Sequence, residues 1–406
     1  LLEALLPLLP EDDGRAAALL RLARLQLALG DSSRAGTTLE EALRLQPDFA
    51  EARDLFDELL GLECRFAELA ASYEARAATL SERQPRIALL RRAADLFREQ
   101  AKDLAAAARV LDEARELAPD DLELTEVCAQ ALVAAGRDED AAALDAALLA
   151  RDPRNEQAFA RRVGYLKSLE DAEGQALLYE FRAAHEPPQA AASLLLDAAE
   201  LRQALGHLSA AEDDARRAFD LEPANEQAFS VLVGKYAGRS PETLAELLEK
   251  RARAVPAEAA GLHRTRAQVL VEVGRLEAAA SALDAALLLA PDDLESLVLR
   301  ADLAEELAGD LAARPFDERL LARSEAGARL PHPHLVRAHY RSGLAAFAQG
   351  ELSLATDRLG AAFALDSHHD RTDEALQALA HCHAASDNRA RLYAVSMARA
   401  ERLEDR

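Results

Sequence analysis

Prolines recur along this chain at a nearly constant interval. Those that end helical patterns stand at positions 10, 47, 119, 153, 188, 223, 256, 291 and 331. Neighbouring prolines in this series are 33 to 40 residues apart, except for one interval of 72, which is two units. Proline ends a helix because it has no backbone N–H to continue the hydrogen-bond ladder. The spacing therefore predicts a chain built from short helical units that repeat from end to end.

The stretch from Leu262 to Pro291 contains one complete unit. Apolar faces at helical spacing are formed by Ala267, Leu270 and Val273 in a first helix and by Ala279, Leu283 and Ala286 in a second. Gly274 separates the two helices, and Pro291 ends the second. Several of the facing residues are small, and small side chains allow two helices to approach closely. The unit is therefore expected to be a helix-turn-helix.

Numbered from Ala260, this unit has small residues at positions 8, 20 and 27, glycine at 15, leucine at 24 and proline at 32. This order resembles the tetratricopeptide repeat family, whose unit is a pair of helices in 34 residues. The resemblance implies an all-α fold, a right-handed α-solenoid (superhelix) of about ten to eleven helix-turn-helix repeats. It also implies that the first helix of each pair lines a concave wall.

We expect one continuous solenoid over residues 1–404. Its units lie near residues 16–49, 50–84, 87–120, 121–154, 155–188, 189–224, 225–257, 258–292, 293–331, 334–368 and 370–404, after a half unit at 1–10. Because the sequence starts inside a repeat, we expect the natural protein to extend upstream.

Four units depart from the pattern. Residues 50–84 have no glycine in the turn, and residues 87–120 have one extra residue there. Asp145 occupies position 24, where an apolar residue is expected, so its helix should rotate slightly or expose the aspartate. Pro315 lies inside the second helix of unit 293–331, which we expect to be extended or broken.

Composition narrows the classes of function. The net charge of −24 argues against DNA or RNA as a partner, because nucleic-acid binding depends on a basic surface. No run of 18 uncharged apolar residues is present, so we expect no membrane span. The three cysteines are far apart, which favours reduced thiols and a cytoplasmic location. Arginine outnumbers lysine 44 to 4, which we interpret as the coding bias of a GC-rich, bacterial genome.

The candidate groove residues follow from the family pattern, in which positions 2, 5, 9 and 12 of each first helix face the groove. They are Glu51, Asp54 and Glu58 in one acidic stripe and Glu295, Asp302 and Glu305 in another. These carboxylates would attract a basic peptide or an amphipathic helix. The alternative is that each stripe is the solvated face of an amphipathic helix.

Two further stripes at groove positions are more apolar. They are Leu20, Arg24 and Leu27 in the first unit and Tyr340, Leu344 and Phe347 near the C-terminus. Either a partner helix docks on such a surface or the chain itself covers it. For the first stripe the cover would be upstream repeats, and for the second it would be the segment around 310–330.

Reactive and metal-binding motifs are not evident. The sequence has no GxxxxGK[ST] loop, no HExxH and no GxSxG, so we predict no enzyme activity and no cofactor. Seven of the ten histidines follow residue 330: His332, His334, His339, His368, His369, His381 and His383. Two pairs of them lie in successive loops and could converge on a metal, but we interpret them as exposed loop residues and predict no metal site.

The sequence favours a non-catalytic scaffold that binds a protein or peptide partner along a largely acidic groove. The alternative is the regulatory or sensor arm of a larger protein whose catalytic domain lies outside this sequence. A third hypothesis, a pentatricopeptide RNA binder, conflicts with the acidity of the chain. The sequence does not determine the oligomeric state.

Overall fold

The computed structural model describes residues 12–404, and within that range all regular secondary structure is helical. The chain divides into two compact units, one that ends at Glu186 and one that begins at Pro187. The half repeat predicted at residues 1–10 lies outside the described residues.

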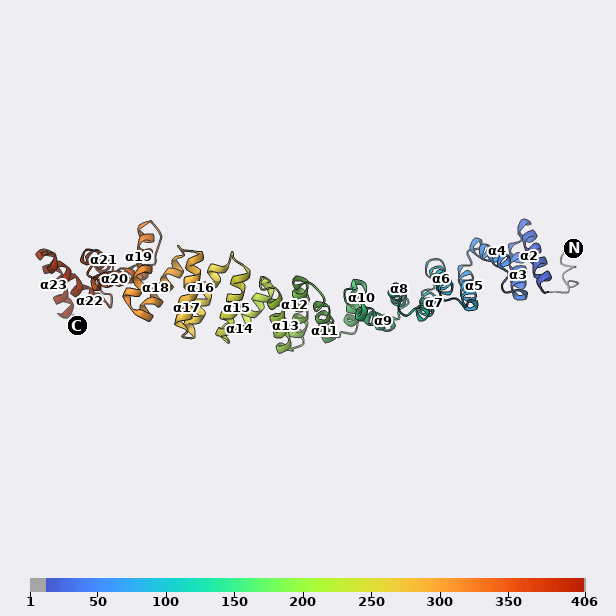
Figure 1. Cartoon of the computed structure of the whole chain (residues 1–406), viewed down its shortest axis with the longest axis horizontal. Helices are drawn as coiled ribbons and strands as arrows, with labels where there is room; N and C mark the ends of the chain where they lie inside the picture. The colour runs from blue at the N-terminus through green and yellow to red at the C-terminus, as the bar shows by residue number, and fades with distance from the viewer. Residues whose placement is uncertain (1–11, 405–406) are drawn as a thin grey trace. The chain divides into compact units, whose positions relative to one another are not determined.

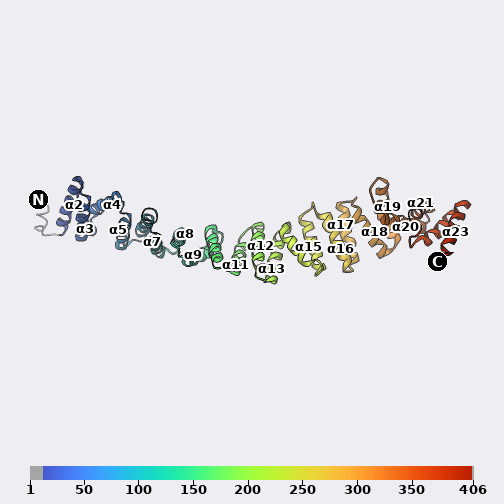
Figure 2. The same cartoon turned by 180° about the vertical axis from the view of Figure 1, so that it is seen from behind.

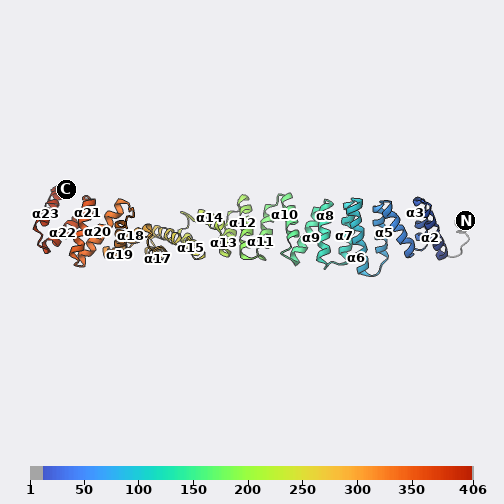
Figure 3. The ribbon, with the colours of Figure 1, turned by 90° about the horizontal axis from the view of Figure 1, so that it is seen from above.

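The unit that ends at Glu186 contains five helix pairs in its described part. They are α2 (Asp12–Ala28) and α3 (Ser32–Leu45), α4 (Ala50–Leu62) and α5 (Phe66–Thr79), α6 (Arg83–Asp95) and α7 (Leu104–Leu117), α8 (Leu122–Ala134) and α9 (Asp138–Arg151), and α10 (Glu156–Ser168) and α11 (Ala172–Ala183). Each helix packs against the next one in the sequence. Figure 3 shows them as a row from dark blue α2 to green α11.

The unit that begins at Pro187 contains six pairs in its described part. They are α12 (Pro188–Ala204) and α13 (Leu208–Leu221), α14 (Glu226–Tyr236) and α15 (Pro241–Ala254), α16 (Ala259–Glu272) and α17 (Leu276–Leu289), α18 (Leu294–Ala308) and α19 (Asp310–Glu325), α20 (His332–Ala348) and α21 (Leu352–Leu365), and α22 (Thr372–Ala385) and α23 (Arg389–Glu404). Again each helix packs against its successor, from green α12 to red α23 (Figures 1 and 2). The predicted all-α solenoid of helix-turn-helix repeats is confirmed.

The turn inside each pair requires a left-handed residue. Gly30 has φ of 78° and Gly274 has φ of 73°. In both turns the N–H after the glycine donates back to a carbonyl of the preceding helix, Asp31 to Gln26 and Arg275 to Leu270, at 2.9 Å. This is the Schellman arrangement, in which glycine is favoured because it has no Cβ to clash.

The extra residue predicted in the turn of unit 87–120 is absorbed by a short π-helix, Leu96–Ala101, that continues α6. Lys102 then adopts the left-handed conformation with φ of 59°. A π-turn holds one more residue than an α-turn, so α7 can begin without a shift of its buried face.

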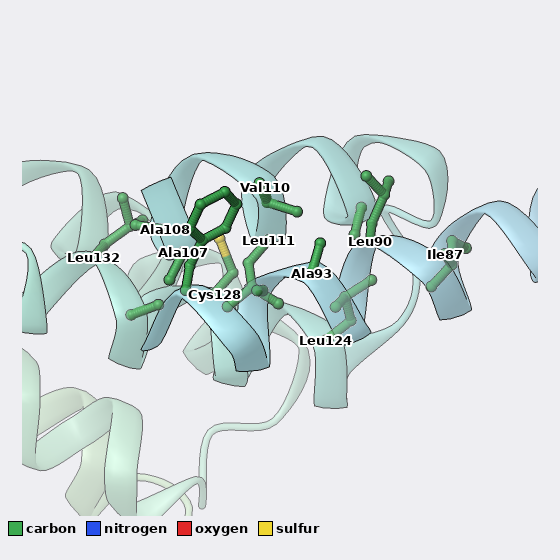
Figure 4. Close-up of a cluster of buried hydrophobic side chains, with 14 of the residues drawn as sticks. Ile87, Leu90, Ala93, Ala107, Ala108, Val110, Leu111, Leu124, Cys128 and Leu132 are labelled. Carbon is green, nitrogen blue, oxygen red and sulfur yellow. The ribbon is translucent and has the colours of Figure 1, made fainter. Parts of the chain in front are cut away.

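The hydrophobic core clusters take their residues from neighbouring pairs. Figure 4 shows such a cluster, with residues from α6, α7 and α8 pointing toward one another. Its labelled members are Ile87, Leu90, Ala93, Ala107, Ala108, Val110, Leu111, Leu124, Cys128 and Leu132. A pair by itself would leave this face exposed to water, so successive pairs must stack to bury it.

The expectation that Asp145 would be exposed, or that its helix would rotate to avoid burial, is wrong. Asp145 is only 1% exposed. Arg161, from the following helix α10, donates to both of its carboxylate oxygens at 2.6 to 3.2 Å. Burial raises the pKa of Asp145, and the hydrogen bonds from Arg161 act in the opposite direction. A charged partner from the next pair therefore replaces the apolar contact.

Helix α19 is extended but not broken. It runs without interruption through Pro315, which lies in its second turn. Phe316 and Leu330 pack against a core cluster that includes Leu297 and Leu320. The segment around 310–330 therefore covers α18. We predicted that it would cover the Tyr340 stripe, and it does not.

Candidate partner-binding cleft

Three first helices of the second unit, α16, α18 and α20, border a cleft of about 880 Å³. Its lining residues are Arg264 and Gln268 of α16, Asp292 to Glu295, Val298, Leu299 and Asp302 in and before α18, Arg329 to Pro331 of the α19–α20 loop, and His334 of α20. Leu294, Val298 and Leu330 make part of the lining apolar, while charged side chains surround them. The cleft therefore combines apolar and charged surface on consecutive first helices.

Asp293 and Arg264 organise one side of the cleft. The Asp293 carboxylate caps α18 by accepting from the Ser296 backbone N–H at 3.1 Å. Arg264 pairs with Asp293 at 2.7 Å and with Glu295 at 3.1 Å. Partial burial alone would raise the pKa of Asp293, but the hydrogen bonds from Ser296 and Arg264 outweigh it and hold that pKa below its usual value. Asp293 is therefore ionised at neutral pH.

The guanidinium of Arg341 lies behind the cleft and is 2% exposed. It donates to both oxygens of buried Asp317 at 2.6 and 3.0 Å, to Asp302 at 2.6 Å and to Glu305 at 2.9 Å. One cation thus joins carboxylates from α18 and α19 to α20. Such a fork-shaped, charge-assisted contact fixes both distance and orientation.

Arg371, just before α22, extends this network across more of the chain. It pairs with Asp310 at 2.5 Å and with Glu305 at 3.4 Å, although these residues are 61 and 66 positions away. The contact ties the α18–α19 turn to the start of α22, two pairs further on. We infer that it stiffens this part of the repeat array.

The predicted stripe on α18 is divided by these contacts. Glu295 is exposed and lines the cleft. Asp302 also lines the cleft but is half-buried and bound to Arg341 and, at 3.2 Å, to Arg337. Glu305 is held by Arg341 and Arg371 and is not among the residues that line the cleft. Of the three carboxylates, Glu295 is thus the one most accessible to a partner.

The predicted stripe on α4 is open to solvent. Glu51, Asp54 and Glu58 are all exposed. Glu51 pairs with Arg24 of α2 at 3.0 Å, and both side chains are more than half exposed. An ion pair at such a surface contributes little to stability, so both groups can be rearranged at low cost.

The apolar stripe on α2 belongs mainly to the core. Leu20 is 3% exposed, and it lies in a cluster with residues of α3 and α4. Leu27 is half-buried and packs against the same cluster. Neither side chain offers a fully open surface, whereas Arg24 does.

The stripe on α20 is covered by the pairs that follow it. Tyr340 is fully buried, its hydroxyl donates to the Asp366 carbonyl at 2.8 Å, and its ring stacks on His369 with 4.6 Å between centroids. Leu344 and Phe347 are partly buried against the same cluster. The chain itself therefore covers this surface, through α21 and α22.

Arg341 and Asp317 are the residues that sequence reasoning missed. Asp317 interrupts an apolar face at the same repeat position as Asp145, and Arg341 lies at helical spacing between Ala338 and Ala345. An arginine inside an apolar face and an aspartate at a core position are the two signals that together predict a buried pair.

Two other kinds of site are absent from the part of the chain that the structure describes. No group of three or more histidine, cysteine, aspartate or glutamate side chains is placed to hold a metal ion there. Among those same residues, no helix has both the length and the apolar character that crossing a membrane requires.

Comparison with known families now identifies the repeat. The family model of the tetratricopeptide repeat matches residues 16–49, which contain α3 and most of α2. Residues 16–49 are a tetratricopeptide repeat. The remaining pairs have the same helix-turn-helix form as this first tetratricopeptide unit. A search of curated proteins finds no match.

Solved structures similar to this chain include the C-terminal part of a TPR repeat-containing protein from Cytophaga hutchinsonii. It has 16% identity, covers 62% of this chain and 99% of its own, and gives a TM-score of 0.34. The Cut9–Hcn1 hetero-tetramer of APC/C has 15% identity, 95% and 73% coverage and a TM-score of 0.28. YrrB, described as a TPR protein with an unusual peptide-binding site, has 18% identity, 53% and 91% coverage and a TM-score of 0.26.

Proposed function

We propose that this tetratricopeptide repeat protein is a non-catalytic scaffold that binds a protein or peptide partner. The cleft bordered by α16, α18 and α20 is the proposed site. The observation that carries the proposal is its combination of an apolar lining at Leu294, Val298 and Leu330 with open carboxylates. Side chains of a partner segment could bury apolar surface there while their backbone stays at the mouth.

The charges around the cleft favour a partner with basic residues. Asp292 and Glu295 are 70% and 73% exposed, so they can turn toward a second cation. The chain as a whole carries a net charge of −24, which would steer a basic segment toward it. We propose an amphipathic segment, with apolar residues on one side and lysine or arginine at its edges. Asp54 and Glu58 on α4 are a second proposed contact for such a segment.

We also propose a source and a cellular location for the protein. The excess of arginine over lysine supports a bacterial source, and the three free cysteines support a cytoplasmic location.

Selection from a displayed library of random peptides tests the proposed function. The whole chain is immobilised, bound peptides are synthesised, and their affinity is measured by fluorescence anisotropy. Val298→Asp places a charge on the apolar lining of the cleft, so we expect a loss of affinity of about tenfold or more.

Leu177→Asp is the matched control, because Leu177 is an exposed leucine on α11, in the other unit. It should leave both binding and helicity unchanged. Selected peptides that bind the Val298→Asp variant as tightly as the parent would contradict the proposal.

A further inference from the structure

A second, smaller hollow lies between α16 and α18 and is named here the slot. Its volume is about 210 Å³. It is lined by Ala267, Gln268 and Val271 of α16, Leu283 of α17, and Leu299, Asp302, Leu303 and Glu306 of α18. The slot and the cleft share Gln268, Leu299 and Asp302, so the two hollows adjoin. A segment in the cleft can therefore place a side chain in the slot.

The size and lining of the slot limit what it accepts. Sites for small molecules have volumes of roughly 300–1,000 Å³, so the slot is too small for most of them and suits a single side chain. Ala267, Val271, Leu283, Leu299 and Leu303 supply only apolar atoms from their side chains. A polar side chain buried there would find few hydrogen-bond partners among them, whereas an aliphatic side chain has no hydrogen bonds to lose.

The charged residues of the slot lie on one helix, a single turn apart. Asp302 and Glu306 are related as i and i+4, which places them on the same side of α18. Both carboxylate oxygens of Asp302 are already paired, one with Arg341 at 2.6 Å and the other with Arg337 at 3.2 Å. Glu306 is exposed. Glu306 is therefore the carboxylate of the slot that is open to a cation of the partner, and it lies beside an apolar hollow.

We propose that the slot is a specificity subsite that accepts an aliphatic side chain of the partner, with a neighbouring lysine or arginine bound by Glu306. This inference rests on the proposed function, because the slot is reached by a segment that lies in the cleft. It adds a defined requirement, namely that an aliphatic and a basic residue stand together in the partner.

The test uses the peptides selected on the whole chain and two exposed positions of the slot. Val271→Phe adds a ring at the mouth of the slot, since Val271 is 43% exposed, and Glu306→Lys reverses the free charge. Each variant is expected to weaken binding by about tenfold or more. The selected peptides should be enriched in an aliphatic residue next to lysine or arginine.

Glu272→Lys, at the end of α16, and Val273→Phe, directly after it, are matched controls, because both residues are exposed and neither lines the slot or the cleft. Both should bind like the parent, and all four variants should melt like the parent.

The possible results separate this inference from the proposed function. If Val298→Asp weakens peptide binding but either slot variant binds like the parent, the slot proposal is wrong and the scaffold proposal stands. The same holds if the selected sequences lack the aliphatic and basic pair. If the selected peptides bind all three variants as tightly as the parent, or if the library yields no binder, both proposals are wrong.

Discussion

Single residues of this protein show that a core position can be charged if the neighbouring repeat supplies the counter-charge. Asp145 and Asp317 are both at most 1% exposed, and each is bound by an arginine of the next pair. Removing one partner of such a pair leaves a buried charge without compensation. The arginine of each buried pair therefore contributes more to stability than an arginine at an exposed surface position does in most proteins.

Arg161→Met should destabilise the α8–α10 region by about 3–5 kcal/mol, because Asp145 would remain buried without its partner. The double variant Asp145→Leu with Arg161→Met should recover most of that loss by restoring an apolar contact. Hydrogen exchange of peptides from α9 and α10 measures both effects. Equal protection in Arg161→Met and in the parent would show that the pair does not stabilise these helices.

The element that the sequence defines most sharply is the turn within a pair. Glycine occupies it in most pairs, but Cys64 and Glu170 adopt the same left-handed backbone with φ of 57° and 56°. A side chain in that conformation costs roughly 1–2 kcal/mol, while glycine loses about 0.5–1 kcal/mol of chain entropy. The difference favours glycine at both positions.

Cys64→Gly and Glu170→Gly should each stabilise their own pair by about 0.5–1 kcal/mol. Both residues are exposed, so no packing is lost. The urea midpoint reports the change, and Gly274→Ala, at φ of 73°, is the control that should have the opposite sign. A lower midpoint in either glycine variant would mean that the native side chain makes a stabilising contact.

Helix boundaries were largely predictable from the sequence, and the open binding surface was not. The predicted units starting at 50 and 121 begin within one residue of α4 and α8, because proline, glycine and apolar spacing act within a single unit. The candidate residues Leu20 and Tyr340 were placed in a groove by their repeat position, yet both are buried. Neighbouring helices bury these two side chains, and the position of a residue within one repeat does not specify which helices pack against it.

At the scale of the whole molecule, arginines make the same kind of hydrogen bond to the loops between several pairs. In five pairs an arginine of the second helix donates to a carbonyl of the loop that precedes the pair: Arg151 to Pro119, Arg182 to Pro153, Arg251 to Ala224, Arg319 to Pro291 and Arg402 to Ser367. These carbonyls lie in loops outside the helical hydrogen-bond ladders, so the arginines supply them with a donor. The arginine-rich composition thus has a structural role that composition alone did not indicate.

Acid should weaken the unit that begins at Pro187 before the other unit. Burial lowers the pKa of His263, His339 and His383, with nearby arginines acting in the same direction. The folded chain therefore keeps these imidazoles neutral, whereas the unfolded chain protonates them near pH 6.5. Their contribution to stability is complete above that pH and is lost as the pH falls through the folded-state pKa values.

Hydrogen-exchange protection factors at pH 7.5 and 6.0 check this expectation. Protection should fall in α16, α20 and α22, which carry the three histidines, and a variant with glutamine at all three should lose the pH dependence. The unit that ends at Glu186 contains one histidine, the exposed His185, and is the internal reference. An equal fall in both units would assign the effect to other groups.

The sequence by itself determined that this chain folds into paired helices, near which residues most pairs begin, and which small residues face the core. These properties depend on local backbone preferences and on periodicity, which are complete within about 34 residues. Only the tertiary structure decided which charges pair and which hollow stays open. Arg341 meets Asp302 across 39 residues, and Arg371 meets Asp310 across 61. Contacts of this length form only after successive pairs have stacked, because stacking sets the distance between side chains of different repeats.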